Sequence, residues 1–319
     1  MTVVSTSEAV TVRKVADSFP AMGTVFEIVL LHENERLLRA LLNEVREEVA
    51  RLEAKLSRFL TTSEVSRINR LAGKGPVLID FEMLEILGAA LDFYHKTSGA
   101  FDITVAPLLR RWGLYERRGR AVDAQTLRQL LQDVGSDLIE LDRRRRTVAF
   151  KRPGVEIDLG AVGKGFAVRE VVDLLRSAGV QHGFVSFGGS SIYALGNAPG
   201  REGWPFSFRL APEEQLSPVP ISLQDRSLTI SGNTVRTVDV ADRQIGHVLD
   251  PASGQPAESV VAVAVVHESP FVGEMLSTAM MVLGPEKGAE ILAQENAGAL
   301  FAIRAEDGIV LREVKFTEV

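Results

Sequence analysis

The stretch around which the chain is organised reads Asp158-Leu-Gly-Ala-Val-Gly-Lys-Gly-Phe-Ala167. Residues 157–159 are typical of the end of a buried strand, and from Phe166 apolar residues recur at helical spacing as far as Leu175. The pattern predicts a strand, a tight glycine-rich turn and a helix. Such a turn lets the backbone approach a ligand and points helix N–H groups at it, which favours phosphate, and Lys164 adds a positive charge.

This stretch matches neither of two common phosphate-binding motifs. A P-loop requires four residues between its glycines and Ser or Thr after its lysine, where Gly165 stands. A dinucleotide fingerprint requires Gly or Ala where Val168 stands. A glycine-eased helix start with a solvated lysine explains the stretch equally well, so a nucleotide phosphate site is a hypothesis that needs support from the rest of the chain.

Composition predicts a globular protein and excludes several classes. The 319 residues, 45% of them hydrophobic, suffice for a large core in one elaborate domain or two. The net charge of −6 argues against nucleic acid as a partner, and the basic run Arg143–Arg146 is short enough for a solvated turn. With no cysteine, the chain has no disulfide, thiolate metal site or nucleophilic cysteine.

The N-terminal residues 1–20 are polar and mixed in charge, without the apolar core of a signal peptide. No later segment reaches the roughly 18 apolar residues of a transmembrane span. We therefore expect a flexible lead-in over residues 1–20, a single domain over residues 21–319, no transmembrane segment, and a cytoplasmic location for the chain as given. A leader removed before the first residue would make the location periplasmic.

The order of segments predicts an α+β fold with mixed, largely antiparallel sheets flanked by helices. Ser63 and Asp80 are candidate N-caps of two helices. Further helices are expected at residues 33–58, 124–134, 271–283 and 286–294. Strands are expected at residues 22–31, 138–141, 148–150, 184–187, 192–195, 206–210, 227–231, 260–266, 299–303 and 310–314.

Three polar clusters could carry chemistry beside the glycine-rich turn. Ser231-Gly-Asn233 is followed by the turn-rich segment Gly246–Gly254, and this context distinguishes His247 from the other histidines. Glu274 and Thr278 share one helical face, and their hard oxygens suit Mg²⁺ when phosphates complete its coordination shell. The segment 100–102 could offer an exposed aromatic ring and a carboxylate to a heterocycle.

Each cluster also has a purely structural interpretation. An isolated histidine is more often structural than catalytic, and pairs four residues apart occur by chance on many solvated helix faces. Phe101 and Asp102 are equally explained by a packed ring and an Asx turn. The combination of clusters therefore carries more weight than any one of them.

Taken together, the motifs resemble the ApbE family, the FAD:protein FMN transferases. The resemblance covers roughly residues 20–315. It is carried by Met22-Gly-Thr24, Ser57-Arg-Phe59 with Ser63-Glu64 and Asn69, Gly99-Ala-Phe-Asp-Ile-Thr104, Asp158 to Ala167, Gly188-Gly189, Thr229-Ile-Ser-Gly232, His247-Val-Leu-Asp-Pro251 with Gly254, and Leu276-Ser-Thr-Ala279 with Gly284.

The resemblance implies an ApbE-like, T-fold-like architecture and an enzyme that binds FAD with Mg²⁺. It implies transfer of the FMN half of FAD to a Ser or Thr hydroxyl of a partner flavoprotein, with release of AMP. The implied catalytic residues are His247 and Glu274, with His247 assisting the attacking hydroxyl. The implied metal positions are the Ala161 carbonyl, Glu274 and Thr278, and the implied flavin-nucleotide contacts are Met22, Phe59, Ala100, Phe101, Asp102, Asp158, Lys164 and Val248.

The residue types fit this chemistry. Splitting a pyrophosphate requires charge neutralisation and in-line placement of the nucleophile, which a metal, a lysine and helix amides can supply. A neutral histidine can accept the hydroxyl proton. Two alternatives stay open: a protein that binds or stores FAD without transfer, and a metal-dependent FAD pyrophosphatase that releases FMN and AMP.

The chain departs from the family pattern at three positions. Glu274 stands where the family has a metal-binding aspartate, so the carboxylate must retract or the ion must shift by about an ångström. Ser190 stands where an Asp often follows the two glycines, and Arg169 where an Asp commonly ends the glycine-rich motif. We expect these last two to change local hydrogen bonding more than chemistry.

Overall fold

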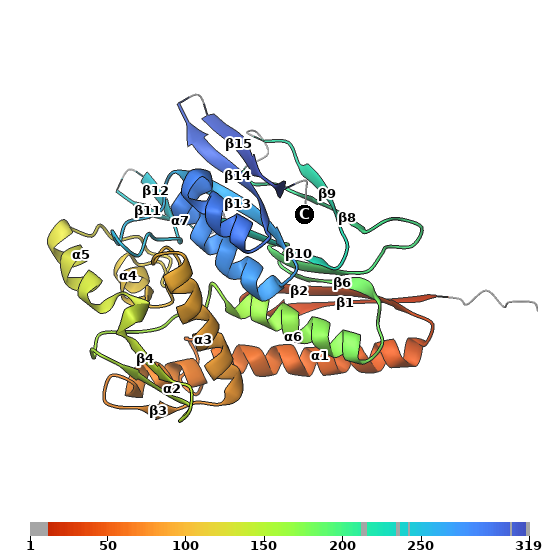
Figure 1. The fold of residues 1–319 in the computed structure, drawn as a ribbon, viewed down its shortest axis with the longest axis horizontal. Helices are drawn as coiled ribbons and strands as arrows, with labels where there is room; N and C mark the ends of the chain where they lie inside the picture. The colour runs from red at the N-terminus through yellow and green to blue at the C-terminus, as the bar shows by residue number, and fades with distance from the viewer. Residues whose placement is uncertain (1–11, 212–215, 234–236, 242, 307, 317–319) are drawn as a thin grey trace, which may run out of the picture.

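A single antiparallel sheet of eight strands forms the centre of the molecule (Figure 1). The computed structural model describes residues 12–211, 216–233, 237–241, 243–306 and 308–316. The strand order is β1-β2-β6-β7-β10-β13-β14-β15, and every neighbouring pair is antiparallel. The strands are β1 (Arg13–Ala21), β2 (Thr24–His32), β6 (His182–Phe187), β7 (Ser191–Leu195), β10 (Arg226–Gly232), β13 (Val260–His267), β14 (Gly298–Ala305) and β15 (Gly308–Val314). The expected α+β class is confirmed.

Both faces of this sheet are covered. On one face lie the helices α1 (Glu35–Leu56), α6 (Gly163–Ser177) and α7 (Pro270–Gln294), which share the main core with the strands (Figure 1). On the other face the hairpin of β8 (Trp204–Phe208) and β9 (Val219–Leu223) closes a second apolar cluster. The central strand β13 is therefore buried at all of its positions, which explains its continuous apolar sequence.

A smaller group of elements packs at one end of the sheet (Figure 1). It contains a three-stranded sheet in the order β3-β5-β4, and an apolar cluster in which Trp112 and Leu127 meet Val240 and Leu249. Its elements are α2 (Glu64–Leu71), β3 (Val77–Leu78), α3 (Phe81–Lys96), α4 (Ala106–Arg111), α5 (Ala124–Leu130), β4 (Ile139–Asp142), β5 (Thr147–Phe150), β11 (Thr237–Val240) and β12 (Arg243–Gly246). Two short 3-10 turns at Leu131–Asp133 and Ser136–Leu138 complete it.

The helix boundaries follow local capping, as the sequence predicts. Ser63 accepts a hydrogen bond from the backbone N–H of Ser66, and Asp80 accepts one from that of Met83, so both expected N-caps are confirmed. The two helices expected at the end of the chain form one element, α7, with a break at Gly284, whose φ is 69°. Glycine tolerates that backbone conformation, and Pro285 then starts the second helical part.

The flexible lead-in expected over residues 1–20 is wrong for residues 13–20. Residues 13–21 form β1, an edge strand that pairs with β2 along its whole length. Only Val15 and Ala21 of this strand are fully buried, and the exposed positions carry polar side chains such as Arg13 and Lys14. The composition of the strand therefore resembles that of a loop. Residues 1–11 lie outside the described residues.

The strand expected at residues 157–159 is also wrong. This segment is extended, but its backbone pairs with a side chain and a loop instead of a neighbouring strand. Asn69 accepts from the N–H of Ile157 at 2.8 Å and donates to its carbonyl at 2.9 Å, and the N–H of Asp158 donates to Ile103 at 2.7 Å. An isolated extended segment and a strand have the same apolar pattern, so periodicity cannot separate them.

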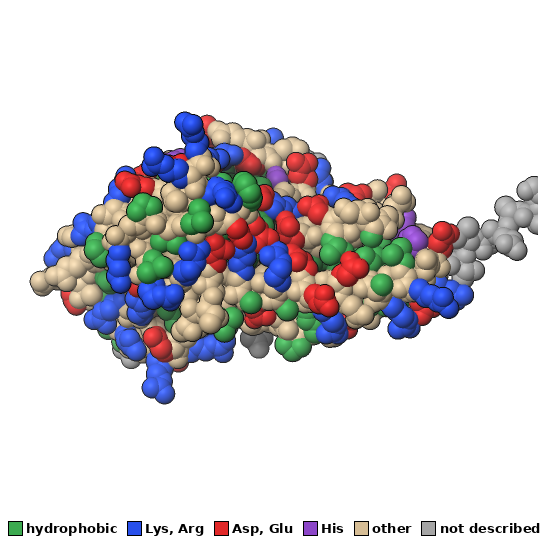
Figure 2. Space-filling view, turned by 90° about the horizontal axis from the view of Figure 1, so that it is seen from below, with side chains coloured by type: hydrophobic (Ala, Val, Ile, Leu, Met, Phe, Trp, Pro, Cys, Tyr) green, Lys and Arg blue, Asp and Glu red, His purple; other side chains and the backbone are tan. Residues whose placement is uncertain are grey.

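The surface seen from the α1 side has acidic and basic side chains side by side across its middle, without separation into large regions of one sign (Figure 2). Ion pairs on this helix include Arg51 with Glu48 at 2.7 Å and with Glu82 at 2.6 Å. Among the described residues, no helix has the length and apolarity that crossing a bilayer requires.

Close contact between the starts of α6 and α7 depends on Gly165. A Cβ added there would lie 2.4 Å from the Pro270 carbonyl oxygen and 2.8 Å from Cβ of Glu274. We expect Gly165→Ala to lower the free energy of unfolding by about 1–3 kcal/mol through overpacking, as measured by urea denaturation. The matched control is Gly163→Ala, because a Cβ there would make an ordinary 3.6 Å contact with Leu56. Equal effects of the two substitutions would contradict this packing argument.

Candidate active site

The starts of α6 and α7 bring a lysine onto a buried carboxylate. Nζ of Lys164 lies 2.7 Å from Oε1 of Glu274, 2.8 Å from Oγ of Ser191 and 3.2 Å from Oγ of Ser190. Ser191 in turn donates to Oε2 of Glu274 at 2.7 Å. Only 5% of Glu274 is exposed. Two residues that the sequence placed in separate motifs, 110 positions apart, therefore form one charged cluster with the first residues of β7.

Hydroxyl groups continue this cluster along α7. Thr278 and Ser277 both donate to the backbone carbonyl of Glu274, at 3.1 and 3.0 Å, and Ser277 also contacts Oγ of Ser231 on β10 at 2.8 Å. The predicted metal donors Glu274 and Thr278 thus lie on one helical face, and Ala161 lies in the turn that leads into α6. The oxygen donor set is chemically suited to a hard cation such as Mg²⁺, provided that Lys164 leaves Oε1.

Asp158 forms a second polar group at the entrance to the glycine-rich turn. Its Oδ1 accepts from the N–H of Gly160 at 2.7 Å, and its Oδ2 accepts from the Tyr115 hydroxyl at 2.6 Å. Burial, reinforced by the negative charge of Asp158, raises the pKa of Tyr115, so the phenol stays protonated and donates. Arg58 lies 3.4 Å from the same carboxylate oxygen, with its guanidinium 4.0 Å above the Tyr115 ring.

An exposed aromatic ring stands beside this group. Phe59 is 73% exposed, and its ring meets Tyr115 edge to face with 5.8 Å between centroids. A large apolar side chain that is this exposed, next to the half-buried carboxylate of Asp158, is suited to contact with a planar heterocycle. The predicted positions Phe59 and Asp158 are therefore brought together by Tyr115, which the sequence did not single out.

Tyr115→Phe removes a hydrogen bond that positions Asp158 but leaves the charge of Asp158 unchanged, so it tests the importance of that position alone. The resemblance implies that the Asp158 carboxylate contacts FAD, and the hydroxyl is one of its hydrogen-bond donors. We therefore expect FAD to bind roughly tenfold more weakly, the typical effect of losing a hydrogen bond to a charged group. The rate at saturating FAD should stay near that of the parent. Fluorescence titration with FAD measures the first and transfer kinetics the second. The control is Tyr94→Phe on α3, which removes the hydroxyl that donates to the carboxylate of Asp137. An unchanged affinity for FAD would contradict this role.

A third group holds the His247 segment in place. Asn233 accepts from the N–H of Val248 at 3.0 Å and donates to the carbonyl of Ala257 at 2.7 Å. On the other side, Nε1 of Trp112 donates to the carbonyl of Gly254 at 2.9 Å. His247 is half-buried, whereas Val248 is buried and its carbonyl accepts from the N–H of Ala257 at 3.0 Å. A cavity of about 310 Å³ adjoins this segment, lined in part by Asn233, Gly246 and Arg304.

Chain connectivity and a hydroxyl contact link this segment to the start of α7, which carries Glu274 and Thr278. Asn233 directly follows β10, whose Ser231 touches Ser277 on α7, one residue before Thr278. The His247 segment, the hydroxyl-bearing face of α7 and Lys164 on α6 are thus connected through the ends of β7 and β10. Ser191 at the start of β7 pairs with Thr229 on β10, and Asn233 after β10 binds the N–H of Val248, so these segments are neighbours at one end of the central sheet.

Met22 lies at the same end of the sheet. Met22 and Gly23 have φ of 49° and 72° and form the two-residue turn between β1 and β2, a backbone typical of a type I′ turn. The N–H of Gly188 donates to the carbonyl of Val25 at 2.8 Å. This bond places the Met22 turn beside the loop that carries Ser190, a neighbour of Lys164.

The expectation of an exposed aromatic ring and carboxylate at residues 100–102 is wrong. Phe101 is 1% exposed and packs edge to face on Phe93, with 5.5 Å between centroids. Asp102 forms an Asx turn, accepting from the N–H and hydroxyl of Thr104 at 2.7 Å and from the hydroxyl of Ser136 at 2.8 Å. Burial raises the pKa of Asp102. Contacts from this segment, including buried Ala100, would therefore come from its backbone.

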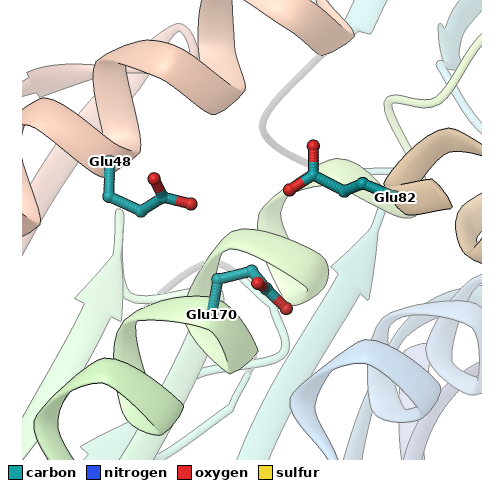
Figure 3. A group of neighbouring side chains, drawn as sticks. All are labelled: Glu48, Glu82 and Glu170. Carbon is teal, nitrogen blue, oxygen red and sulfur yellow. The ribbon is translucent and has the colours of Figure 1, made fainter. Parts of the chain in front are cut away.

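A further group of carboxylates forms between α1, α3 and α6 (Figure 3). Oxygens of Glu48, Glu82 and Glu170 lie within 4.8 Å of one another. Arg51 binds the first two, and Arg169 binds Glu170 at 2.8 Å. Burial alone would raise the pKa of Glu82, but hydrogen bonds from Arg51 and Lys55 outweigh it and lower the pKa. These carboxylates are therefore neutralised by arginine and lysine and fasten the three helices together.

Comparison with known proteins agrees with this geometry. The family model described as ApbE family matches residues 22–301, so the chain belongs to the ApbE family. The FAD:protein FMN transferase of Treponema pallidum is 29% identical over 296 residues, covering 86% of this chain and 82% of its own. That of Haemophilus influenzae is 27% identical over 304 residues, covering 91% and 87%. The resemblance drawn from the sequence, and with it the assignment to a family of enzymes, is confirmed.

The same family appears among solved structures. The crystal structure of the Pseudomonas stutzeri flavinyl transferase ApbE in its apo form matches with a TM-score of 0.84 at 28% identity, covering 95% of each chain. The apbe protein of Thermotoga maritima matches with a TM-score of 0.85 at 25% identity, covering 95% of this chain and 97% of its own. The ApbE-like architecture is thus confirmed over nearly the whole chain.

Proposed function

We propose that this protein transfers the FMN half of FAD to a Ser or Thr hydroxyl of a partner flavoprotein and releases AMP, in a Mg²⁺-dependent reaction. The observation that carries the proposal is the cluster of Lys164, Glu274 and Ser191 at the start of two helices. It lies in a chain whose relatives are named FAD:protein FMN transferases. A cation, a carboxylate and helix amides at one place suit a pyrophosphate with a metal ion.

Binding of FAD would use the groups on either side of this cluster. Phe59 offers an exposed ring, Asp158 a carboxylate held by Tyr115, and Lys164 an ammonium in the first turn of α6. The positive end of the helix dipole adds to the charge of Lys164. Ala161, Glu274 and Thr278 would hold the metal ion, which would neutralise charge on the pyrophosphate.

The transfer itself balances without an enzyme-bound intermediate. The acceptor oxygen forms a bond to the phosphorus of the FMN half, the bond from that phosphorus to the bridging oxygen breaks, and AMP leaves with the electron pair. The hydroxyl proton moves to the imidazole of His247, the general base in this proposal.

One observation favours a second candidate, a protein that binds FAD without transferring it. Both oxygens of Glu274 already have partners within the chain, Lys164 on Oε1 and Ser191 on Oε2. A carboxylate satisfied in this way can persist without a metal ion, and FAD binding would then not lead to reaction.

A single product analysis separates these functions. The protein is incubated with FAD and Mg²⁺, with and without a bacterial flavoprotein that carries an acceptor Ser or Thr, and with EDTA as the control. Transfer predicts an acceptor heavier by one FMN unit and one AMP released per adduct. Bound FAD without AMP would select the storage function, and free FMN with AMP but no adduct would select a pyrophosphatase. No adduct with any of several acceptors would overturn transfer.

A further inference from the structure

The ammonium of Lys164 contacts the carboxylate oxygen of Glu274 to which a metal ion would bind. Nζ of Lys164 is 2.7 Å from Oε1 of Glu274, while Ser191 holds Oε2. We propose that Lys164 is a built-in counter-ion that competes with the divalent cation for Glu274, so that the metal binds weakly until a dinucleotide pyrophosphate draws the lysine away. The identity of the metal and of the pyrophosphate ligand rests on the proposed function.

Burial makes the competition strong. The side chain of Glu274 is only 6% exposed, and a buried carboxylate requires a charged or hydrogen-bonding partner. A divalent ion on the same oxygen would lie beside the ammonium, and like charges repel strongly where water is excluded. The lysine and a metal ion therefore exclude each other at Oε1, and the ion pair of Lys164 with Glu274 persists until the lysine is drawn away.

The structure also shows which partner can move. The side chain of Lys164 is 17% exposed, about three times the fraction of Glu274, and its ammonium sits on a flexible four-carbon stem in the first turn of α6. It already contacts Ser190, which lies in the loop between β6 and β7 next to the exposed Gly189. A phosphate arriving from this open side can attract the ammonium, and Oε1 is then released for the cation.

This exchange couples two binding events. A pyrophosphate that removes Lys164 from Glu274 raises the metal affinity, and by linkage the metal raises the affinity for the pyrophosphate by the same factor. Part of the coupling is ordinary chelation of the metal by the phosphates, which does not require Lys164. The contribution of the lysine is the part that disappears when its charge is removed.

The test measures metal binding directly, first to the protein alone and then with FAD present, and does not depend on turnover. Mn²⁺ is titrated into the parent protein, Lys164→Gln and Lys164→Arg, with free Mn²⁺ followed by electron paramagnetic resonance and Mg²⁺ added as competitor. We expect Lys164→Gln to bind Mn²⁺ about tenfold more tightly than the parent, within the usual range of coupling between sites. Lys164→Arg keeps the charge and should bind as weakly as the parent. In the presence of FAD, the affinity should rise by a larger factor in the parent than in Lys164→Gln.

The neutral variants are chosen so that a change in Mn²⁺ affinity can be told apart from a loss of folding. The amide of Lys164→Gln can still donate to Glu274, so the buried carboxylate keeps a partner. Lys164→Met, checked by thermal unfolding, provides a second neutral variant. The proposal is overturned if both neutral variants bind Mn²⁺ no more tightly than the parent, or if no saturable site appears in any of them. Tighter Mn²⁺ binding together with absent FMN transfer would keep this inference and remove the proposed function.

Discussion

Transfer of FMN is expected to fall by about 10²–10⁴-fold in His247→Ala, the usual contribution of a general base, while FAD affinity stays unchanged. The physical reason is that, in the proposed mechanism, the imidazole accepts the acceptor's hydroxyl proton and does not hold the nucleotide. The backbone around His247 is held by other residues: Asn233 accepts from the N–H of Val248, and Trp112 donates to the carbonyl of Gly254. Truncation should therefore leave the segment in place.

The measurement combines FAD titration with single-turnover transfer to the acceptor. His95→Ala is the matched control, because this imidazole is 61% exposed on α3, where it lies 3.8 Å from Asp137 and meets the Tyr94 ring with 5.2 Å between centroids. It should transfer FMN at the parent rate. Equal rates in His247→Ala and the parent would remove the assigned role of His247 and leave the acceptor to be activated by another group.

Glu274→Gln is the second substitution with a large expected effect. The amide preserves size and can still contact Ser191, but it removes the charge that both Lys164 and a metal ion require. We expect transfer to fall by at least about 10²-fold, the scale seen when one electrostatic stabiliser of a transition state is lost. Dependence of the residual rate on Mg²⁺ should disappear, as measured by rates across a Mg²⁺ titration.

Glu274→Asp tests the length of the side chain. The shorter carboxylate should preserve or strengthen the Mg²⁺ dependence, because it restores the family's residue and draws the oxygen away from Lys164. Glu268→Gln, an exposed position just before α7, is the control for a simple charge change. If transfer and Mg²⁺ dependence are the same in the parent, Glu274→Gln and Glu274→Asp, Glu274 is not a metal ligand.

Local chemistry explains what could be predicted about the fold. N-caps at Ser63 and Asp80 and the long amphipathic α1 depend on residues three or four positions apart, so they are visible in the sequence. Edge strand β1 pairs with β2 over separations that grow from 3 residues at Ala21–Thr24 to 19 at Arg13–His32, and the segment at residues 157–159 is held by Asn69, 88 positions earlier. The composition of both segments is compatible with a loop or with a strand. Their state is set by pairing, which periodicity does not contain.

Some features of the candidate site could likewise be predicted from the sequence, and others are visible only in the structure. The motif order placed Lys164, His247 and Glu274 in one family and hence in one expected site, and the structure joins Lys164 to Glu274 directly. Tyr115 had no signal, because its contacts with Arg58, Phe59 and Asp158 all join it to residues more than 40 positions away along the chain. Phe101 and Asp102 carry the family motif, yet their side chains are buried, since a motif records which residues occur and not which way they point.

The sequence by itself thus determined the family, the α+β class, the glycine-rich turn before α6 and the residue types of the site, because each of these depends on short-range patterns or on ordered motifs. Only the tertiary structure decided that the turn's lysine rests on Glu274 and that Tyr115 holds Asp158. The physical reason is that a buried charge takes whichever partner the packing of distant segments brings within hydrogen-bond distance.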